Sequence, residues 1–279
     1  VSEHTLTEVA RQALDSGILQ NANTLRPFAL GEDIAEGDLK EILWDKLKFS
    51  EDVATVSGGA LQEALEEAYS EVGLEETILL TRTNRRTNIY NQGVRARLLW
   101  KEEEISSGDR LMIVKNNYFW TEKYENLPFL ANGDMLEVTR LRNIREMYGF
   151  HFADAQLRAL DYDWEIDAVV WLDTLHSDSP EVNNGLHREL FGRIAEDYPE
   201  LVHNRKKLVE TIYQSPYYNA LQVRFAYAVT GHKSQGGQWK HVYIDPYKGG
   251  DLHAEEEGFY RWLYTAITRA SEKVYFIKN

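Results

Sequence analysis

A polar turn after an apolar run is the first feature of this chain that could do chemistry. Residues 223–239 read VRFAYAVTGHKSQGGQW, so a β-type run ends in hydroxyl, imidazole, amine, amide and glycine residues. Ligands of open α/β sheets bind beyond the carboxyl ends of the strands, and side chains of these types bind phosphate oxygens. The residues concerned are Thr230, His232, Lys233, Ser234 and Gln235. They predict an anion-binding turn; the alternative is a polar loop with a capping glycine.

An arginine at the end of a helix-like stretch is the second such feature. Residues 261–270 read RWLYTAITRA, and Arg269 follows an apolar face that includes Trp262 and Ile267. The planar guanidinium group can bind two oxygens at once, and arginines stabilise the charge that develops on a γ-phosphate during its transfer. The alternative is a surface arginine near a helix C-terminus, where the helix dipole favours positive charge.

Together these two segments resemble motifs V and VI of superfamily 1 nucleic-acid helicases, in the RecD-like (exonuclease V alpha-subunit) branch. The segment LTEVARQ, with Leu6, Arg11 and Gln12, resembles motif IV of the same superfamily. NNYFW at 116–120 and FLANGD at 129–134 resemble the small β-barrel that RecD-like helicases insert before motif V. The resemblance thus extends along nearly the whole chain.

The resemblance implies a role for each matching residue. Arg11 and Arg269 would be the catalytic arginines that contact the γ-phosphate of ATP. The residues of the ATP cleft would be Gln12, Gln235, Gly236 and Gln238, although many relatives have a glutamate where this chain has Gln238. The residues that bind DNA would be Thr230, His232, Lys233 and Ser234, and no metal ligand is implied.

The resemblance also implies that this chain contains only one of the two RecA-like domains of a helicase motor. Superfamily 1 helicases bind ATP and Mg²⁺ between two RecA-like domains, of which the first carries the P-loop. The P-loop signature G-x-x-x-x-G-K-[ST] occurs nowhere in these residues. We therefore expect a truncated chain that lacks an N-terminal P-loop domain, binds neither ATP nor Mg²⁺ alone, and has no ATPase activity by itself. The expected partners are that domain, single-stranded DNA, and other recombination or repair subunits.

The spacing of apolar residues predicts an α/β fold with a β-rich insertion. Residues 60–72 follow the i, i+3, i+4 rule of a helix, and the apolar run at 77–81 is typical of a buried strand. FAYAVT at 225–230 is expected to be one strand of the same sheet. Strand signals separated by turns indicate a small barrel or meander between about 108 and 173.

We therefore expect a RecA-like parallel sheet with flanking helices, interrupted by a small β-barrel insertion. The second motor domain would be discontinuous and would comprise 1–105 and 220–279. The insertion, a barrel plus a helical segment, would comprise 106–219.

Composition narrows the classes of protein. The net charge of −14 argues against a protein that binds nucleic acid through its whole surface, though a local groove is compatible with it. The chain has no cysteine, which excludes disulfides and thiolate metal sites and agrees with a cytoplasmic location. No apolar run approaches the roughly 20 residues that span a bilayer, so we expect no membrane partner.

Two other readings stay open. The chain could be a non-catalytic DNA-binding or adaptor module derived from a helicase. It could also be a metal-dependent nuclease, because Asp161, Asp163, Glu165 and Asp167 alternate along DYDWEID and would share one face of a strand; a solvated strand face is the alternative. Similarly, Tyr118, Phe119 and Trp120 could stack on bases or pack inward.

Overall fold

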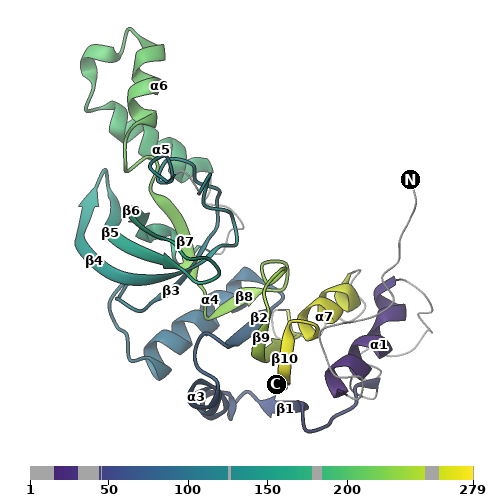
Figure 1. The fold of residues 1–279 in the computed structure, drawn as a ribbon. Coiled ribbons are helices and arrows are strands. Elements are labelled where there is room, and N and C mark those ends of the chain that lie inside the picture. The colour runs from purple at the N-terminus through teal and green to yellow at the C-terminus, as the bar shows by residue number, and fades with distance from the viewer. Residues whose placement is uncertain are drawn as a thin grey trace. The chain divides into compact units, whose positions relative to one another are not determined.

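The computed structural model describes residues 16–30, 44, 46–124, 127–177, 184–248 and 258–278. The chain divides into two compact units (Figure 1). The first comprises Val1–Leu99 and Tyr227–Asn279, and the second is Trp100–Ala226. We call them the α/β unit and the barrel unit, and each is described by itself.

A five-stranded parallel sheet forms the centre of the α/β unit. Its strands follow the order β1-β10-β9-β2-β8 and comprise β1 (Val53–Ser57), β2 (Thr77–Thr81), β8 (Ala228–Thr230), β9 (Trp239–Asp245) and β10 (Ala270–Lys278). β2 is buried along its whole length, as expected of an internal strand with helices on both faces. Because Thr81 pairs with both Thr230 and Asp245, the carboxyl ends of β2, β8 and β9 lie together.

Helices flank this sheet. They are α1 (Gly17–Leu30), α3 (Leu61–Glu71), α4 (Asn84–Gly93), which a π-helical segment (Val94–Leu98) continues, and α7 (Phe259–Ile267). The hydroxyl of Tyr243 in β9 donates to the carbonyl of Ala64 in α3 at 2.7 Å. The side-chain amide of Asn91 in α4 accepts from the N–H of Ala228 at 2.7 Å and donates to the Ala228 carbonyl at 3.1 Å. Asn91 thus supplies hydrogen-bond partners for backbone groups of the edge strand β8 that no neighbouring strand pairs with.

The barrel unit contains a closed five-stranded barrel in the order β3-β4-β5-β6-β7. Its strands are β3 (Arg110–Ile113), β4 (Met135–Met147), β5 (Phe150–Ala159), β6 (Glu165–Trp171) and β7 (Leu221–Phe225). All neighbours are antiparallel except β6 and β7, which run parallel. A parallel pair needs a long crossover, and the crossover here carries α5 (Asn184–Ala195) and α6 (Arg205–Tyr213), with short 3₁₀ turns at Leu172–Thr174 and Pro199–Leu201.

The helical segment shares a core with the barrel strands. Phe152 and Trp171 of the barrel pack with Leu190 of α5 and Ile212 of α6, and all four side chains are fully buried. The predicted fold class, a RecA-like parallel sheet with flanking helices interrupted by a small β-barrel, is confirmed.

The apolar run before the polar turn differs from the prediction. It forms two strands rather than one: β7 ends at Phe225 and belongs to the barrel, whereas β8 begins at Ala228 and belongs to the parallel sheet. The N–H of Ala226 donates to Arg110 of the barrel, and the carbonyl of Tyr227 accepts from Leu79 of the sheet. An apolar run is compatible with a buried strand of the barrel and with one of the parallel sheet. Composition therefore could not show where the chain passes from β7 to β8. The barrel unit accordingly extends beyond the expected 106–219 at both ends.

The four acidic residues that alternate between Asp161 and Asp167 do not share one strand face as predicted. Asp161 and Asp163 lie in the bend before β6, and only Glu165 and Asp167 occupy the exposed face of the strand. Tyr162, between Asp161 and Asp163, is 60% exposed. Within the described residues, no group of three or more His, Cys, Asp or Glu side chains could hold a metal ion.

Candidate phosphate-binding site at the ends of strands β2 and β8

The polar turn is a tight structure that its own backbone holds. After β8 ends at Thr230, the N–H groups of Lys233 and Ser234 both donate to the Thr230 carbonyl, at 2.8 and 3.2 Å. The Ser234 side chain is fully buried, and its hydroxyl donates to the Gly231 carbonyl at 2.8 Å. Gly236 has φ of +92°, a conformation that favours glycine. Ser234 therefore shapes the turn in this structure, and its neighbours face outward.

Arg269 connects the end of α7 to this turn. Its Nε donates to the carbonyl of Thr265 at 3.1 Å, its Nη2 to the Thr268 hydroxyl at 3.3 Å, and its Nη1 to the carbonyl of Gly237 at 3.3 Å. The backbone carbonyl of Arg269 also accepts from the N–H of Trp239 at 2.9 Å. The two segments singled out in the sequence are thus in direct contact.

A cavity of about 390 Å³ opens beside the turn, entirely within the α/β unit. Of the residues predicted from the sequence, His232 and Gln235 line it. Thr230, Lys233, Ser234, Gly236, Gln238 and Arg269 do not. Arg11 and Gln12 lie outside the described residues.

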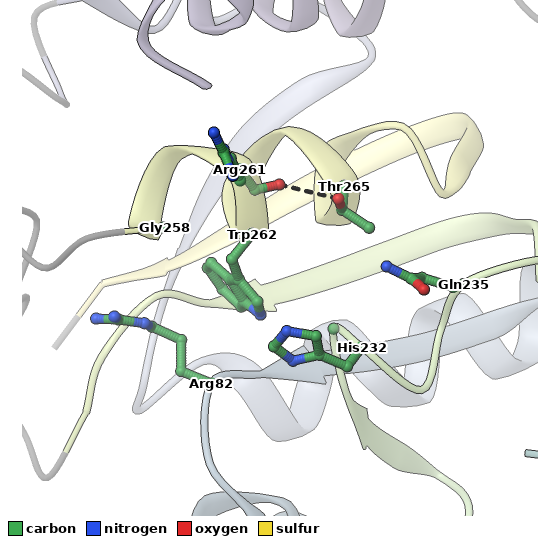
Figure 2. A pocket seen from close by; sticks show the side chains of 8 residues that line it. Arg82, His232, Gln235, Gly258, Arg261, Trp262 and Thr265 are labelled. Carbon is green, nitrogen blue, oxygen red and sulfur yellow. Dashed lines mark hydrogen bonds between the residues drawn. The ribbon is translucent and has the colours of Figure 1, made fainter. Parts of the chain in front are cut away.

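The other walls of the cavity come from residues that the sequence did not single out as site residues. Gly231, Arg82, Gly258, Arg261, Trp262 and Thr265 complete the lining. Figure 2 shows the Trp262 side chain descending from α7 between Arg82 and His232. The Arg82 guanidinium lies 4.9 Å from the ring of Phe259 and 5.9 Å from that of Trp262, in cation–π contact with both.

A sequence signal could have located Arg82 but not Trp262. Arg82 directly follows the buried strand β2, so the strand-end rule that pointed to Thr230 applies to it equally. Trp262 gave no such signal, because its helical spacing is that of a core residue. Its proximity to the turn depends on the packing of α7.

Gly231 and Trp262 are in close contact. A Cβ atom on Gly231 would lie 2.3 Å from Nε1 of Trp262 and 2.6 Å from its Cδ1, so only glycine fits there. The Trp262 Nε1 is buried and has no hydrogen-bond partner among the described residues. A buried donor without a partner costs about 1–3 kcal/mol, so an acceptor brought by a ligand would recover that free energy.

The charge of the lining suits an anion. Arg82 and Arg261 are cationic, and none of the described residues that line the cavity is acidic, although the whole chain carries −14. Arg261 also donates from Nε to the carbonyl of Ala29 in α1 at 2.9 Å, which fixes its position. Concentrated positive charge beside polar side chains such as His232 and Gln235 is the chemistry that binds phosphate.

The neighbouring strand end carries a buried ion pair. Asp245, at the end of β9, is fully buried and pairs with Nε of Arg86 from α4. Tyr90 donates its hydroxyl to the same carboxylate at 2.8 Å. Burial, and then the Asp245 charge, raises the pKa of Tyr90 well above its ordinary value, so its phenol stays protonated. This ion pair fixes α4 to the carboxyl end of β9, next to the strand ends that border the cavity.

Comparisons with known proteins show what this chain is similar to. Residues 225–277 match the profile of the UvrD-like helicase C-terminal domain. An uncharacterized protein of Acanthamoeba polyphaga mimivirus is 24% identical over 244 residues, which cover 73% of this chain and 48% of the relative. Both predicted motifs therefore lie in a part of the chain that is similar to a helicase C-terminal domain, and the chain spans about half the length of this curated relative.

Solved structures of Pif1 helicases are also similar. The Bacteroides enzyme in complex with ADP-AlF3 and ssDNA is 13% identical with a TM-score of 0.47, and the match covers 97% of this chain and 51% of that one. The Candida albicans enzyme is 14% identical with a TM-score of 0.40, covering 98% and 56%. No described helix is long and apolar enough to cross a membrane.

Proposed function

We propose that this chain is the second motor half of an ATP-dependent superfamily 1 DNA helicase of the RecD-like branch, acting in the cytoplasm on single-stranded DNA. The contact between Arg269 and Gly237 carries the proposal, because it joins the two helicase-like segments at one edge of a parallel sheet. The match of residues 225–277 to a helicase C-terminal domain supports it.

In this proposal the cavity binds the sugar–phosphate backbone. His232 and Lys233 contact the strand, together with Thr230 and the Ser234 turn, and Arg82 and the Trp262 Nε1 add donors that the structure brings to the same place. Gln235, Gly236 and Gln238 border the ATP cleft. Arg269, with Arg11 and Gln12 from motif IV, approaches the γ-phosphate of ATP that a P-loop domain holds with Mg²⁺.

ATP hydrolysis stimulated by single-stranded DNA tests the proposal, in a protein that joins these residues to their P-loop domain. Arg269→Ala should lower kcat about 10³-fold, because an arginine finger contributes at least that much. Arg269→Lys should recover little, since lysine cannot present a planar fork. Arg193→Ala, at an exposed arginine of α5, is the control and should leave kcat unchanged. The present chain alone should show no turnover.

One observation favours a second candidate, a non-catalytic DNA-binding or adaptor module. Three N–H groups of Arg269 already donate within the protein, which is what a purely structural arginine does. In that case Arg269→Ala would lower the melting temperature and leave ATP turnover of the longer protein unaffected. Turnover by the present chain alone, abolished by Arg269→Ala, would contradict the expectation that it needs a P-loop domain.

A further inference from the structure

The barrel unit has a second cavity of about 390 Å³, which the motor proposal does not use. It lies between the loop that follows β3, the start of α5 and the segment between α6 and β7. Its lining includes the aromatic, cationic and amide side chains of Lys115, Tyr118, Phe119, Tyr213, Tyr218 and Gln222. All of them belong to the barrel unit.

Aromatic rings form the walls of this cavity. Tyr213 and Tyr218 stack with their centroids 5.3 Å apart and 14° between ring planes, and His187 packs on Tyr218 at 4.5 Å. Tyr118 is 60% exposed and Tyr213 is 53% exposed, so both offer ring surface to a ligand. Large exposed aromatic side chains gathered at a concave site are typical of a binding surface rather than of a core.

The loop that carries Tyr118 and Phe119 is held in place. The side-chain oxygen of Asn117 accepts from the N–H of Phe119 at 3.1 Å, and its Nδ2 donates to the carbonyl of Asn219 at 2.9 Å. Trp120 donates from Nε1 to the same carbonyl at 2.8 Å. A wall that is ordered before binding loses little conformational entropy when a ligand arrives.

Two polar side chains of the cavity, Gln222 and Lys115, have no partner among the described residues. The Gln222 side chain is 6% exposed, and no described residue hydrogen-bonds with it. Its amide offers both a donor and an acceptor. Lys115 is exposed and forms no ion pair within the described residues, and its charge, after burial, helps to lower the pKa of His187. Glu122 is the one acidic residue among the described residues of the lining.

We propose that this cavity holds an unstacked base of single-stranded DNA. The base lies against the Tyr213–Tyr218 pair, the Gln222 amide hydrogen-bonds with its edge, and Lys115 contacts the adjacent phosphate. Aromatic platforms beside a cation are the usual means of binding single strands, and every base has a face that can stack. The proposal extends the DNA-binding role proposed above, but it does not depend on the ATP cleft.

Fluorescence anisotropy of a labelled oligothymidylate with this chain tests the proposal. Tyr213→Ala should weaken binding about fivefold or more, the smallest effect expected for loss of a stacked base. Tyr162→Ala is the matched control, since Tyr162 is equally exposed in the same unit but does not line the cavity, and binding should be unchanged. Gln222→Leu should weaken binding similarly without a lower melting temperature, which separates a ligand contact from a structural role.

Other outcomes would overturn the proposal. Equal effects of Tyr213→Ala and Tyr162→Ala, or no effect of either, would contradict it. Thymidine monophosphate that binds as tightly as the oligonucleotide would assign the cavity to a free nucleotide. A proline-rich peptide that binds in a Tyr213-dependent manner, without oligonucleotide binding, would assign it to a protein partner. Photocrosslinking of an iodouracil-substituted oligonucleotide to residues 213–218 would support it directly. ATP turnover of the longer protein is the readout of the motor proposal and is none of the readouts used here, so failure here is separable from failure of the motor proposal.

Discussion

The two units of this protein build their candidate sites in different ways. In the α/β unit, the cavity lies where the parallel strands β2 and β8 end, and Gly231, His232 and Gln235 of its lining come from one short turn with a recognisable pattern. In the barrel unit, the cavity is lined by residues from a loop, a helix and the return to the last strand, which no short motif contains. The first kind of site can be detected from a motif, whereas the second becomes visible only when the chain has folded.

Two ion pairs, one from each unit, differ in how far they are buried. Asp245 of the α/β unit is fully buried against Arg86. Asp154 of the barrel unit forms a bidentate pair with Arg145 at 2.7 Å, but both side chains remain about one-third exposed. Arg145 is the first cause of the lowered pKa of Asp154. The same two chemical groups should therefore make unequal contributions to stability.

The largest expected effect follows from this difference. Asp245→Ala should destabilise the protein by about 3–5 kcal/mol, because it leaves the charge of Arg86 without its buried partner. Asp154→Ala should cost about 1 kcal/mol or less, since water replaces the partner of an exposed pair. Urea unfolding of the two variants measures both values, and similar losses would remove the distinction between the two ion pairs.

A glycine in each unit gives the next comparison. Gly231→Ala should cost about 1–3 kcal/mol, because the new Cβ displaces Trp262 from the cavity wall. Gly192→Ala, inside α5 where a Cβ meets nothing within 4 Å, should instead stabilise the protein by about 0.5–1 kcal/mol. Thermal melting should show shifts of opposite sign; a neutral Gly231→Ala would mean that Trp262 does not hold the position described here.

The smallest expected effect is on the pH dependence of stability, to which two histidines contribute. Burial lowers the pKa of His241 in β9, whose two ring nitrogens have no hydrogen-bond partner in the part of the chain that the structure describes. Burial also lowers the pKa of half-buried His187. An unfolded histidine takes up a proton near pH 6.5, before either folded one does, so each side chain makes the folded state less stable as the pH falls below that value.

The measurement is the free energy of unfolding at about pH 7.5 and about pH 5.5. His241→Leu should lose less stability over this interval than the wild type, and His187→Leu should differ from the wild type less, because His187 is only half buried. An unchanged pH dependence in His241→Leu would show that another group is responsible.

Much of the fold was predictable because local patterns agreed with it. The helix predicted at 60–72 is α3 (Leu61–Glu71), and the strand predicted at 77–81 has those bounds. The strand signals between 108 and 173 became β3 to β6. Prediction failed where two sheets compete for one apolar run, at β7 and β8, and where a bend replaced a strand, at Asp161 and Asp163. At β7 and β8 the deciding hydrogen bonds join residues far apart in the chain. At the bend they are local, because β5 and β6 form a hairpin there and the N–H of Ala159 donates to the carbonyl of Trp164.

The sequence by itself determined which residue types follow β8, that Arg269 directly follows a helix, and that an α/β fold carries a β-rich insertion, because these depend on spacing over a few residues. Only the tertiary structure decided that Arg82 and Trp262 join His232 around one cavity, and that Gln222 lies beside Tyr213 and Tyr218. Such groupings depend on which strand ends are neighbours and on how helices pack, and local spacing carries no information about either.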